Sequence, residues 1–428
     1  MNKTYKTSII KISNLNLIKD SNLSLFIDEY YKATLFFIDY LWNNKITYKS
    51  NDSEKIFDVK NDQLDCPKFI PTVNINYKTI LSARALKCAA NQACGIIASH
   101  IDKRKRLIYV RNKLQNDGQR TRSLTRKINN LTLKKPSVDY IEPNLNSICS
   151  RVEKSNIKHF DHVLTLSSIG KTFGKIKIPF NYHKHTRKLE SEGKLLSGLM
   201  ISKNNIKLVF EVPIPEPKKE GRVVGADQGI NSCVTLSDSQ ITPKNKHGHD
   251  LNYILNKLKR KTKGSKAFNK VKAQRDNYIN WSIKQLDFSK ISQINLEKIS
   301  NFRYKKNVGK FLNYFNETLI REKLIDIAQQ SGVRIVEQSS PFRSQRCSSC
   351  GYVSKKNRKG KDFSCKHCSF QTDADLNASL NHEIKLSFSF ILFASLREIK
   401  EFFWKEEGFF NLNGSEIVVP DTNKRYKR

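Results

Sequence analysis

Two pairs of cysteines have the spacing of a metal site. Cys347 and Cys350 form one CxxC pair, Cys365 and Cys368 form the other, and fourteen residues separate the pairs. Four thiolates in this arrangement bind one tetrahedral zinc ion, to which each pair supplies two ligands. We therefore predict a structural zinc site, whose ion stabilises the fold and takes no part in chemistry. The other five cysteines are scattered singly, so we predict buried free thiols and no disulfide framework at Cys66, Cys88, Cys94, Cys149 and Cys233.

Three carboxylates stand at the ends of predicted strands or at the start of a predicted helix. Asp227 ends an apolar strand that begins at Arg222, and Glu297 ends a second strand with alternating apolar residues. A single acid at the end of a strand is more often a turn residue than a catalytic one. Two acids at the ends of two strands give more support to a catalytic role. Asp373 and Asp375 open a helix after the cysteines; we assign Asp373 to capping and leave Asp375 as the third acid.

Carboxylate oxygens are the ligands that Mg²⁺ prefers in proteins. Three acids that converge can hold one or two such ions, which activate a water for attack on phosphate and stabilise the leaving oxygen. We predict that Asp227, Glu297 and Asp375 are catalytic, magnesium-binding residues. The reaction that this chemistry favours is phosphodiester hydrolysis.

The net charge indicates the kind of partner. The chain of 428 residues has 77 Lys and Arg against 40 Asp and Glu, a net charge of +37. Such an excess favours a nucleic acid as partner, bound through salt-sensitive contacts. Basic side chains crowd two predicted helical regions, 81–131 and 251–287, and few acids balance them. A merely solvated basic face is the alternative, and for Trp281, in the second region, we expect a place in the core.

Membrane attachment is not supported by any segment. The longest apolar stretch, 384–404, is interrupted by Lys385, Arg397, Lys400 and Glu401, and it falls short of the roughly 18 apolar residues that a membrane span needs. The N-terminus has no apolar signal-peptide core. We therefore expect a cytoplasmic, nucleoid-associated protein with no membrane partner.

Strand and helix patterns indicate an α+β protein of several domains. We predict a β-barrel from residues 1–20 and 155–213, a helical region inserted at 21–154, and a Pro-rich linker at 214–221. The order of elements after the linker suits a mixed sheet flanked by helices. We place this α/β domain at 222–340 and 373–428, with the zinc ribbon inserted at 341–372.

The order of these motifs resembles a known family. Gly225-Ala-Asp-Gln-Gly-Ile, Asn295-Leu-Glu, the paired CxxC motifs after Ser344, and Asp373-Ala-Asp-Leu-Asn-Ala-Ser-Leu-Asn resemble the split RuvC-like nuclease of transposon-encoded TnpB proteins and of the miniature type V-F CRISPR effectors. The resemblance is strong over 222–382 and only architectural before that. Two positions depart from the family pattern: Gln228 stands where a hydrophobic residue is common, and His382 stands where Ile is usual.

The resemblance implies an RNA-guided DNA endonuclease with an RNase H-like (RuvC) domain and a wedge-like barrel. Its partners would be a guide RNA and double-stranded target DNA, recognised beside a short adjacent motif and cut at a single magnesium-dependent RuvC site. The family roles fall on Asp227, Glu297 and Asp375 as magnesium ligands, and the four paired cysteines would hold zinc. The origin of the guide, from a transposon or a CRISPR array, stays open, as does formation of a homodimer.

Two other functions compete with this interpretation. A catalytically weak or inactive RNA-guided DNA-binding regulator would keep the fold without cutting. A guide-independent RuvC-type resolvase or transposase would cut without RNA, but it leaves the basic N-terminal half without a role. Near the expected path of the cut strand, Arg343 and Arg346 are candidates for phosphate contact, with surface solvation as the alternative; we assign neither a catalytic role.

Overall fold

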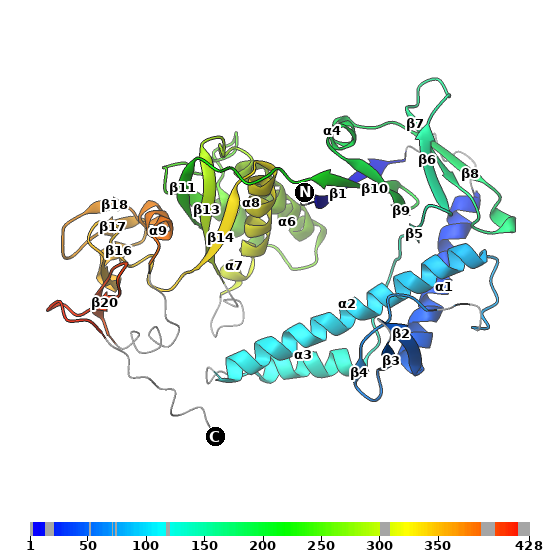
Figure 1. Ribbon diagram of the computed structural model, residues 1–428, viewed down its shortest axis with the longest axis horizontal. Helices are drawn as coiled ribbons and strands as arrows, with labels where there is room; N and C mark the ends of the chain where they lie inside the picture. The colour runs from blue at the N-terminus through cyan, green and yellow to red at the C-terminus, as the bar shows by residue number, and fades with distance from the viewer. Residues whose placement is uncertain are drawn as a thin grey trace. The chain divides into compact units, whose positions relative to one another are not determined.

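The computed structural model describes residues 3–12, 21–50, 53–70, 72, 75–116, 120–299, 309–386 and 399–417. The chain divides after Pro213 into two compact units, Lys3–Pro213 and Ile214–Arg428 (Figure 1). The division falls at the start of the segment Pro213-Ile-Pro-Glu-Pro, in which three prolines restrict the backbone and disfavour regular structure. Each unit has its own hydrophobic core.

The N-terminal unit contains two antiparallel sheets. The first has four strands in the order β1-β10-β9-β5, and the second has three in the order β6-β7-β8. Their bounds are β1 Lys3–Lys11, β5 Asn144–Leu145, β6 Ser150–Lys154, β7 His162–Leu166, β8 Ile176–Phe180, β9 Lys194–Ile201 and β10 Asn205–Pro213. Alternate residues of β10 are buried, which is the period of a strand with one face in a core. Because the described strands pair as two separate sheets, closure into one barrel stays a prediction.

Helices fill the middle of this unit. Helix α1 (Ser21–Asn43) packs against α2 (Ala83–Asn116), which is followed by α3 (Arg122–Leu133). The face of α1 that enters the core carries large aromatic side chains, whereas the first half of α2 buries alanines and cysteines. Large groups on one helix facing small groups on the other let the two backbones approach closely. A small sheet of β2 (Ile46–Ser50), β3 (Ser53–Asp58) and β4 (Gln63–Leu64) lies between α1 and α2 in sequence; α4 (Lys184–Glu192) precedes β9.

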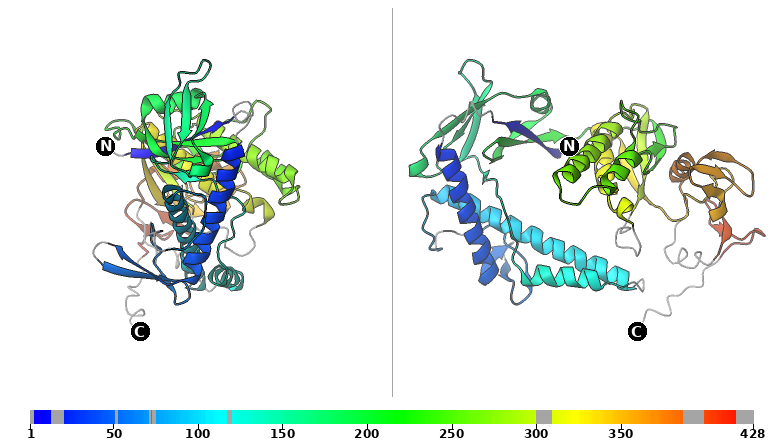
Figure 2. Two further views of the ribbon diagram at one scale, coloured as in Figure 1. Left: turned by 90° about the vertical axis from the view of Figure 1, so that its right-hand side faces the viewer. Right: turned by 180° about the vertical axis from the view of Figure 1, so that it is seen from behind.

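The C-terminal unit is built on a mixed four-stranded sheet. Its order is β12-β11-β13-β14; β11, β13 and β14 run parallel, and β12 is antiparallel to β11. The bounds are β11 Arg222–Asp227, β12 Thr235–Leu236, β13 Ile291–Lys298 and β14 Arg334–Ser339. Four helices contribute to the core beside this sheet: α5 Leu251–Lys259, α6 Lys266–Ile283, α7 Lys310–Asn313 and α8 Glu317–Gln330. Figure 2 shows the sheet with α6 and α8 from two further sides.

A small ribbon is inserted after β14. It contains β15 (Tyr352–Ser354) and the three-stranded sheet of β16 (Arg358–Lys359), β17 (Asp362–Ser364) and β18 (Gln371–Asp373). Helix α9 (Ala374–Glu383) follows and contacts β11, β12 and β13. Strand β19 (Glu401–Trp404) pairs with β15 and with β20 (Phe409–Phe410), so part of the predicted tail completes the ribbon around the buried Trp404.

Some expectations lie partly outside the described residues. These are the parts of the predicted barrel and tail at 13–20, 387–398 and 418–428. Of the five scattered cysteines, four are buried and Cys66 is half-buried, and none forms a disulfide bond. Throughout the described parts of the chain, every helix is too short or too polar to cross a membrane.

Candidate metal-binding nuclease site

Strand β11 presents its two faces to different helices. Val224 and Ala226 point into the core with α5, α6 and α8, so Gly225 and Asp227 point to the opposite face. That face receives α9: a Cβ atom added to Gly225 would lie 1.9 Å from the carbonyl oxygen of Ser379 and 2.5 Å from the amide nitrogen of Glu383. A glycine at position 225 therefore permits contact between the helix backbone and the strand.

Strand β13 brings the second acid to the same place. It runs parallel to β11 with Gly225 opposite Asn295 and Ala226 opposite Leu296, so Asp227 and Glu297 are the next residues of the two neighbouring strands. Carboxyl ends of parallel strands meet at one edge of a sheet, and residues of equal parity share one face. One carboxylate oxygen of Asp227, one of Glu297 and one ring nitrogen of His382 all lie within 4.8 Å of one another.

Helix α9 begins at an acid that caps it. Asp373 is the last residue of β18 and the N-cap of α9, and its Oδ1 accepts hydrogen bonds from the amides of Asp375 (2.8 Å) and Leu376 (3.1 Å). The predicted capping role of Asp373 is confirmed. Asp375 follows in the first turn and is buried. The carboxylate of Asp375 accepts a hydrogen bond from Nη2 of Arg358, on β16 of the ribbon, at 2.9 Å.

The three predicted acids are therefore close but not equivalent. Asp227 and Glu297 belong to the compact group, whose third member is His382; Asp375 lies beside it, near enough for its charge to act on Asp227. The sequence analysis noted His382 only as a departure from a family pattern and gave no role to Arg358. The available signal for His382 was its position seven residues after Asp375, two helical turns along.

Burial and neighbouring charges shift the pKa values of Asp227, Glu297 and His382. Burial, with the negative charges of Glu297 and Asp375, raises the pKa of Asp227 well above its usual range. Burial likewise raises the pKa of Glu297 to about 7. For His382, burial and the nearby charge of Arg343 lower the pKa to about 3, so the imidazole is neutral at neutral pH. Acids held this close together favour a bound cation, which would remove the repulsion between their ionised forms.

The polar groups around the acids are only partly satisfied within the described residues. Nε2 of Gln228 donates to the backbone oxygen of Glu297 at 3.3 Å, but the buried Oε1 of Gln228 has no hydrogen-bond partner there. Nδ1 of His382 is buried and also without one. Unpaired buried acceptors beside carboxylates could accept hydrogen bonds from the water molecules that a divalent cation keeps.

The four paired cysteines converge. One sulfur from each of Cys347, Cys350, Cys365 and Cys368 lies within 4.8 Å of the other three. Sγ of Cys347 is 3.7 Å from Sγ of Cys368, and Sγ of Cys350 is 3.7 Å from Sγ of Cys365. Tetrahedral thiolates at about 2.3 Å from a zinc ion are about 3.8 Å apart, so the cluster has the dimensions of a zinc site.

Arg343 and Arg346 are structural, which corrects the expectation of a phosphate-contacting or solvated pair. Both are buried. Nη1 of Arg343 donates to the backbone oxygen of Asn381 and its Nε to that of Ser339 (2.9 Å). Nε of Arg346 donates to the backbone oxygen of Trp404 at 2.7 Å, and its Nη1 to Oδ1 of Asn381 at 2.5 Å. The two guanidinium groups thus connect the end of α9 to the ribbon and to β19.

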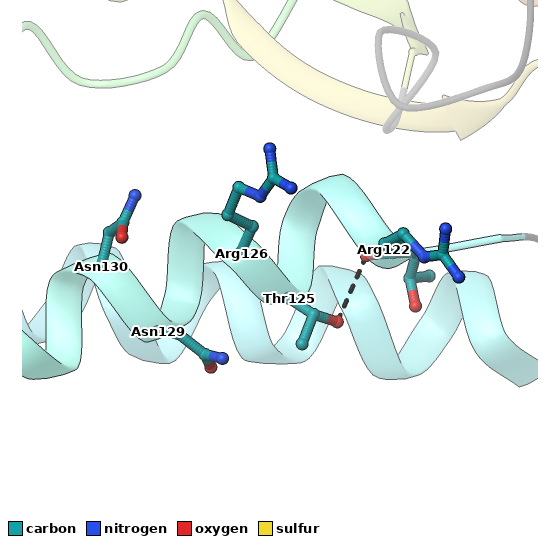
Figure 3. A pocket seen from close by; sticks show the side chains of 6 residues that line it. Arg122, Thr125, Arg126, Asn129 and Asn130 are labelled. Carbon is teal, nitrogen blue, oxygen red and sulfur yellow. Dashed lines mark hydrogen bonds between the residues drawn. The ribbon is translucent and has the colours of Figure 1, made fainter.

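Basic side chains also line helices of both units. On α3, Arg122 and Arg126 project to the same side of the helix as Asn130, and all three are exposed; Oγ1 of Thr125 donates to the backbone oxygen of Thr121 at 3.3 Å (Figure 3). The alternating charged and polar groups suit a phosphate backbone.

The second basic region differs from expectation at two residues. Trp281 is 40% exposed on α6, so the prediction of a core position was wrong. Arg275, which lies in the basic region 251–287, is buried; its Nη2 donates to Asp276 Oδ1 at 2.6 Å and its Nη1 to the backbone oxygen of Tyr314 at 2.7 Å. The periodic pattern did not distinguish these positions because α6 has charged residues on both sides of its buried face.

The four paired cysteines and Asp375 lie within the part of the chain that matches a known family, whereas Asp227 and Glu297 precede it. Residues 319–382 match the Cas12f1-like TNB domain family. A CRISPR-associated endodeoxyribonuclease Cas12f1 of Sulfoacidibacillus thermotolerans is 32% identical over 90 residues, which are 21% of this chain and 21% of that protein. One from an uncultured archaeon is 26% identical over 159 residues, 32% of this chain and 28% of the relative. The aligned segments thus span less than a third of either relative.

Solved structures give weaker similarity over more of the chain. A cryo-EM structure of a Cas12f1–sgRNA–target DNA complex has a TM-score of 0.43 and 14% identity, and the match covers 90% of this chain and 99% of that one. The mini-RNA-guided endonuclease CRISPR-Cas_phi3 has a TM-score of 0.42 and 10% identity, covering 89% and 92%. The resemblance expected from the sequence is confirmed by the family and sequence matches: parts of the chain are similar to Cas12f1 proteins, and residues 319–382 match the Cas12f1-like TNB domain family.

Proposed function

We propose that the chain is an RNA-guided DNA endonuclease with one RuvC-like site. The observation that carries the proposal is the meeting of Asp227 and Glu297 on neighbouring parallel strands, beneath the helix that carries Asp375. Relatives that match part of the chain are named as CRISPR-associated endodeoxyribonucleases. The activity, the nucleic-acid partners and both metals are part of the proposal.

Each group of the site has a role that follows from its chemistry. Asp227, Glu297 and Asp375 would hold one or two magnesium ions, which supply Lewis acidity and an activated water when bound. Arg358 holds Asp375 through one Nη atom, and a third of its side chain (33%) is exposed and able to contact a phosphate oxygen. Asp375 and His382 are buried where α9 packs on β11, and burial strengthens electrostatic contacts.

The four cysteines would bind zinc, and the ion would hold the ribbon that carries Arg358. The basic helices would bind nucleic-acid backbone: α2 and α3 in one unit, α5 and α6 in the other. Base pairing with a guide RNA would supply sequence specificity, because none of these groups selects a base. A target-adjacent motif and a wedge-like role for the N-terminal sheets complete the proposal.

Cleavage by the natural complex tests this function. The full chain, purified from cells that carry its own locus, is probed by sequencing the RNA that copurifies. The complex is then incubated with plasmids that carry the complement of that RNA beside a randomised flank. We expect cutting that requires both RNA and Mg²⁺, and loss of cutting with retained target binding in Asp227→Asn and Glu297→Gln. Glu322→Gln, which alters an exposed carboxylate on α8, is the matched control.

The competing functions give different results in the same experiment. Target binding without cutting, equal in wild type and Asp227→Asn, would identify a regulator. Cutting that persists after removal of the RNA would identify a guide-independent resolvase or transposase. The mass of the purified complex gives the number of protomers on each RNA.

A further inference from the structure

His382 is a buried histidine without an assigned role. It lies in the last turn of α9 and is 1% exposed. Its Nδ1 is buried without a hydrogen-bond partner among the described residues, and one of its ring nitrogens lies within 4.8 Å of carboxylate oxygens of both Asp227 and Glu297. A buried nitrogen left unpaired costs about 1–3 kcal/mol. An apolar side chain at this position would avoid that cost, so the imidazole needs another explanation.

Helix α9 and strand β11 run in opposite directions, and this sets which groups meet. A Cβ added to Gly225 would lie 2.8 Å from the carbonyl carbon of His382, whereas one added to Gly229, further along the chain, would lie 3.7 Å from Oδ2 of Asp375. Asp227 lies between these two glycines. Because His382 is seven residues after Asp375, both side chains project from the same face of α9, about 10 Å apart along its axis.

The potential metal ligands on the two sides of Asp227 therefore differ in kind. On one side stands Asp375, an oxygen donor held by Arg358. On the other side stand Glu297 and the ring of His382. Imidazole nitrogen binds first-row transition ions, the later ones most strongly and Mn²⁺ least, whereas Mg²⁺ prefers oxygen ligands and keeps much of its water. An imidazole nitrogen at this distance from two carboxylates is in position to act as a third ligand.

We infer that His382 is a nitrogen ligand of the divalent ion held by Asp227 and Glu297, and that it makes this position favour Mn²⁺ over Mg²⁺. The inference rests on the proposed metal site but does not need the chain to cleave DNA.

Pulsed electron paramagnetic resonance of bound Mn²⁺ tests the ligand directly. The full chain, with zinc in its ribbon, is loaded with Mn²⁺ and measured by three-pulse electron spin echo envelope modulation. We expect ¹⁴N modulation from a coordinated imidazole, replaced by the ¹⁵N pattern when the protein is labelled with ¹⁵N-histidine. Absence of histidine nitrogen coupling in wild type overturns the inference, and this result needs no variant.

Variants locate the nitrogen and measure the preference. His382→Gln should lose the coupling and weaken Mn²⁺ binding by roughly tenfold or more, while Mg²⁺ affinity, from competition, changes less than about threefold. His247→Gln, at an exposed histidine of the same unit, is the matched control and should keep both. Coupling that persists in folded His382→Gln, or equal losses for both metals, would exclude His382 as the selective ligand. If wild type showed the histidine nitrogen coupling to Mn²⁺ but did not cleave DNA, only the proposed function would be contradicted.

Discussion

The carboxyl group of Glu297 couples folding stability to pH. Its pKa is raised to about 7 in the folded chain from 4.5, mainly by burial, so the protonated form stabilises the fold. This contribution is complete below pH 4.5 and is lost as pH rises through about 7. Without added magnesium, Glu297→Gln should therefore gain about 2 kcal/mol of stability relative to wild type between pH 5 and pH 8.

Denaturant unfolding of the zinc-loaded protein at the two pH values checks this expectation. Glu322→Gln, on the surface of α8, should show no such gain. Added Mg²⁺ should stabilise wild type more than Glu297→Gln at pH 8, because the ion binds the ionised carboxylate. If the difference in unfolding free energy between wild type and Glu297→Gln did not change with pH, burial would not be the cause of the raised pKa of Glu297.

Arg358 affects the metal through Asp375. Its guanidinium donates to the carboxylate at 2.9 Å and therefore opposes a divalent cation at the same oxygens. We expect Arg358→Gln to bind Mn²⁺ more tightly, by about 1 kcal/mol or roughly fivefold, because a charge beside the site is removed. Cleavage by this variant should nevertheless be slower, since the contact to phosphate is lost. Mn²⁺ titration followed by the signal of the free ion measures the affinity; weaker binding would mean that Arg358 orders Asp375 for the metal.

At the residue scale, sequence reasoning succeeded where local rules apply. Asp227 could be placed because an apolar strand stops there, and Asp373 because an acid before a helix caps it. Arg343 was misassigned because nothing in a sequence marks a cation that is buried against backbone oxygens from α9. His382 and Arg358 depend on contacts between elements far apart in the chain, so their positions followed only from the folded structure.

The contact of α9 with β11 depends on one glycine. A methyl group on Gly225 would overlap the backbone of α9 at Ser379 and Glu383. We expect Gly225→Ala to displace the helix, destabilise the C-terminal unit by about 2–3 kcal/mol and weaken Mn²⁺ binding. Gly95→Ala, in the interior of α2 with no atom within 4 Å of the added methyl group, should instead stabilise its unit by about 0.5–1 kcal/mol.

Thermal unfolding and Mn²⁺ titration of the two glycine variants distinguish these effects. Unchanged Mn²⁺ affinity in Gly225→Ala would mean that α9 does not set the position of the metal ligands.

Zinc should be required for the site as well as for the ribbon. The sulfurs of Cys350 and Cys365 are 3.7 Å apart, and loss of either would open the cluster. We expect Cys350→Ser to lose bound zinc, to unfold the ribbon and to abolish cleavage, because Arg358 and the start of α9 lie in or beside the ribbon. Metal analysis of the purified wild-type protein should give one zinc ion per chain. Cys66→Ser, outside the cluster, should retain it; full zinc content in Cys350→Ser would exclude the four-thiolate site.

Among the elements, strands with a clear period were the easiest to predict. Strands β11 and β13 alternate between a core face and a site face, and α9 begins at a capping signal. The relation between the two N-terminal sheets was harder, because barrel closure depends on pairing between strands far apart in the chain. The pairing of β19 with the ribbon had no local signal either, since it joins residues 352 and 403.

The whole molecule carries a net charge of +37, which should make nucleic-acid binding steeply dependent on salt. If Arg122 and Arg126 contact phosphates, their joint replacement by Gln should lower the slope of log K against log salt by about one to two. Lys188→Gln, at a lysine already paired with Glu192, is the control and should leave the slope nearly unchanged. Filter binding of the copurified RNA at several salt concentrations measures the slopes; equal slopes would place the RNA elsewhere.

The absence of a connecting loop between β18 and α9 has a mechanical consequence. Asp373 is at once the final strand residue and the helix cap, so the two elements share a residue and have no hinge between them. A tilt of the ribbon would therefore also rotate the start of α9 and move the carboxylate of Asp375. Nucleic acid that binds the ribbon at Lys359 and Lys361 would in this way change the geometry of the proposed metal site.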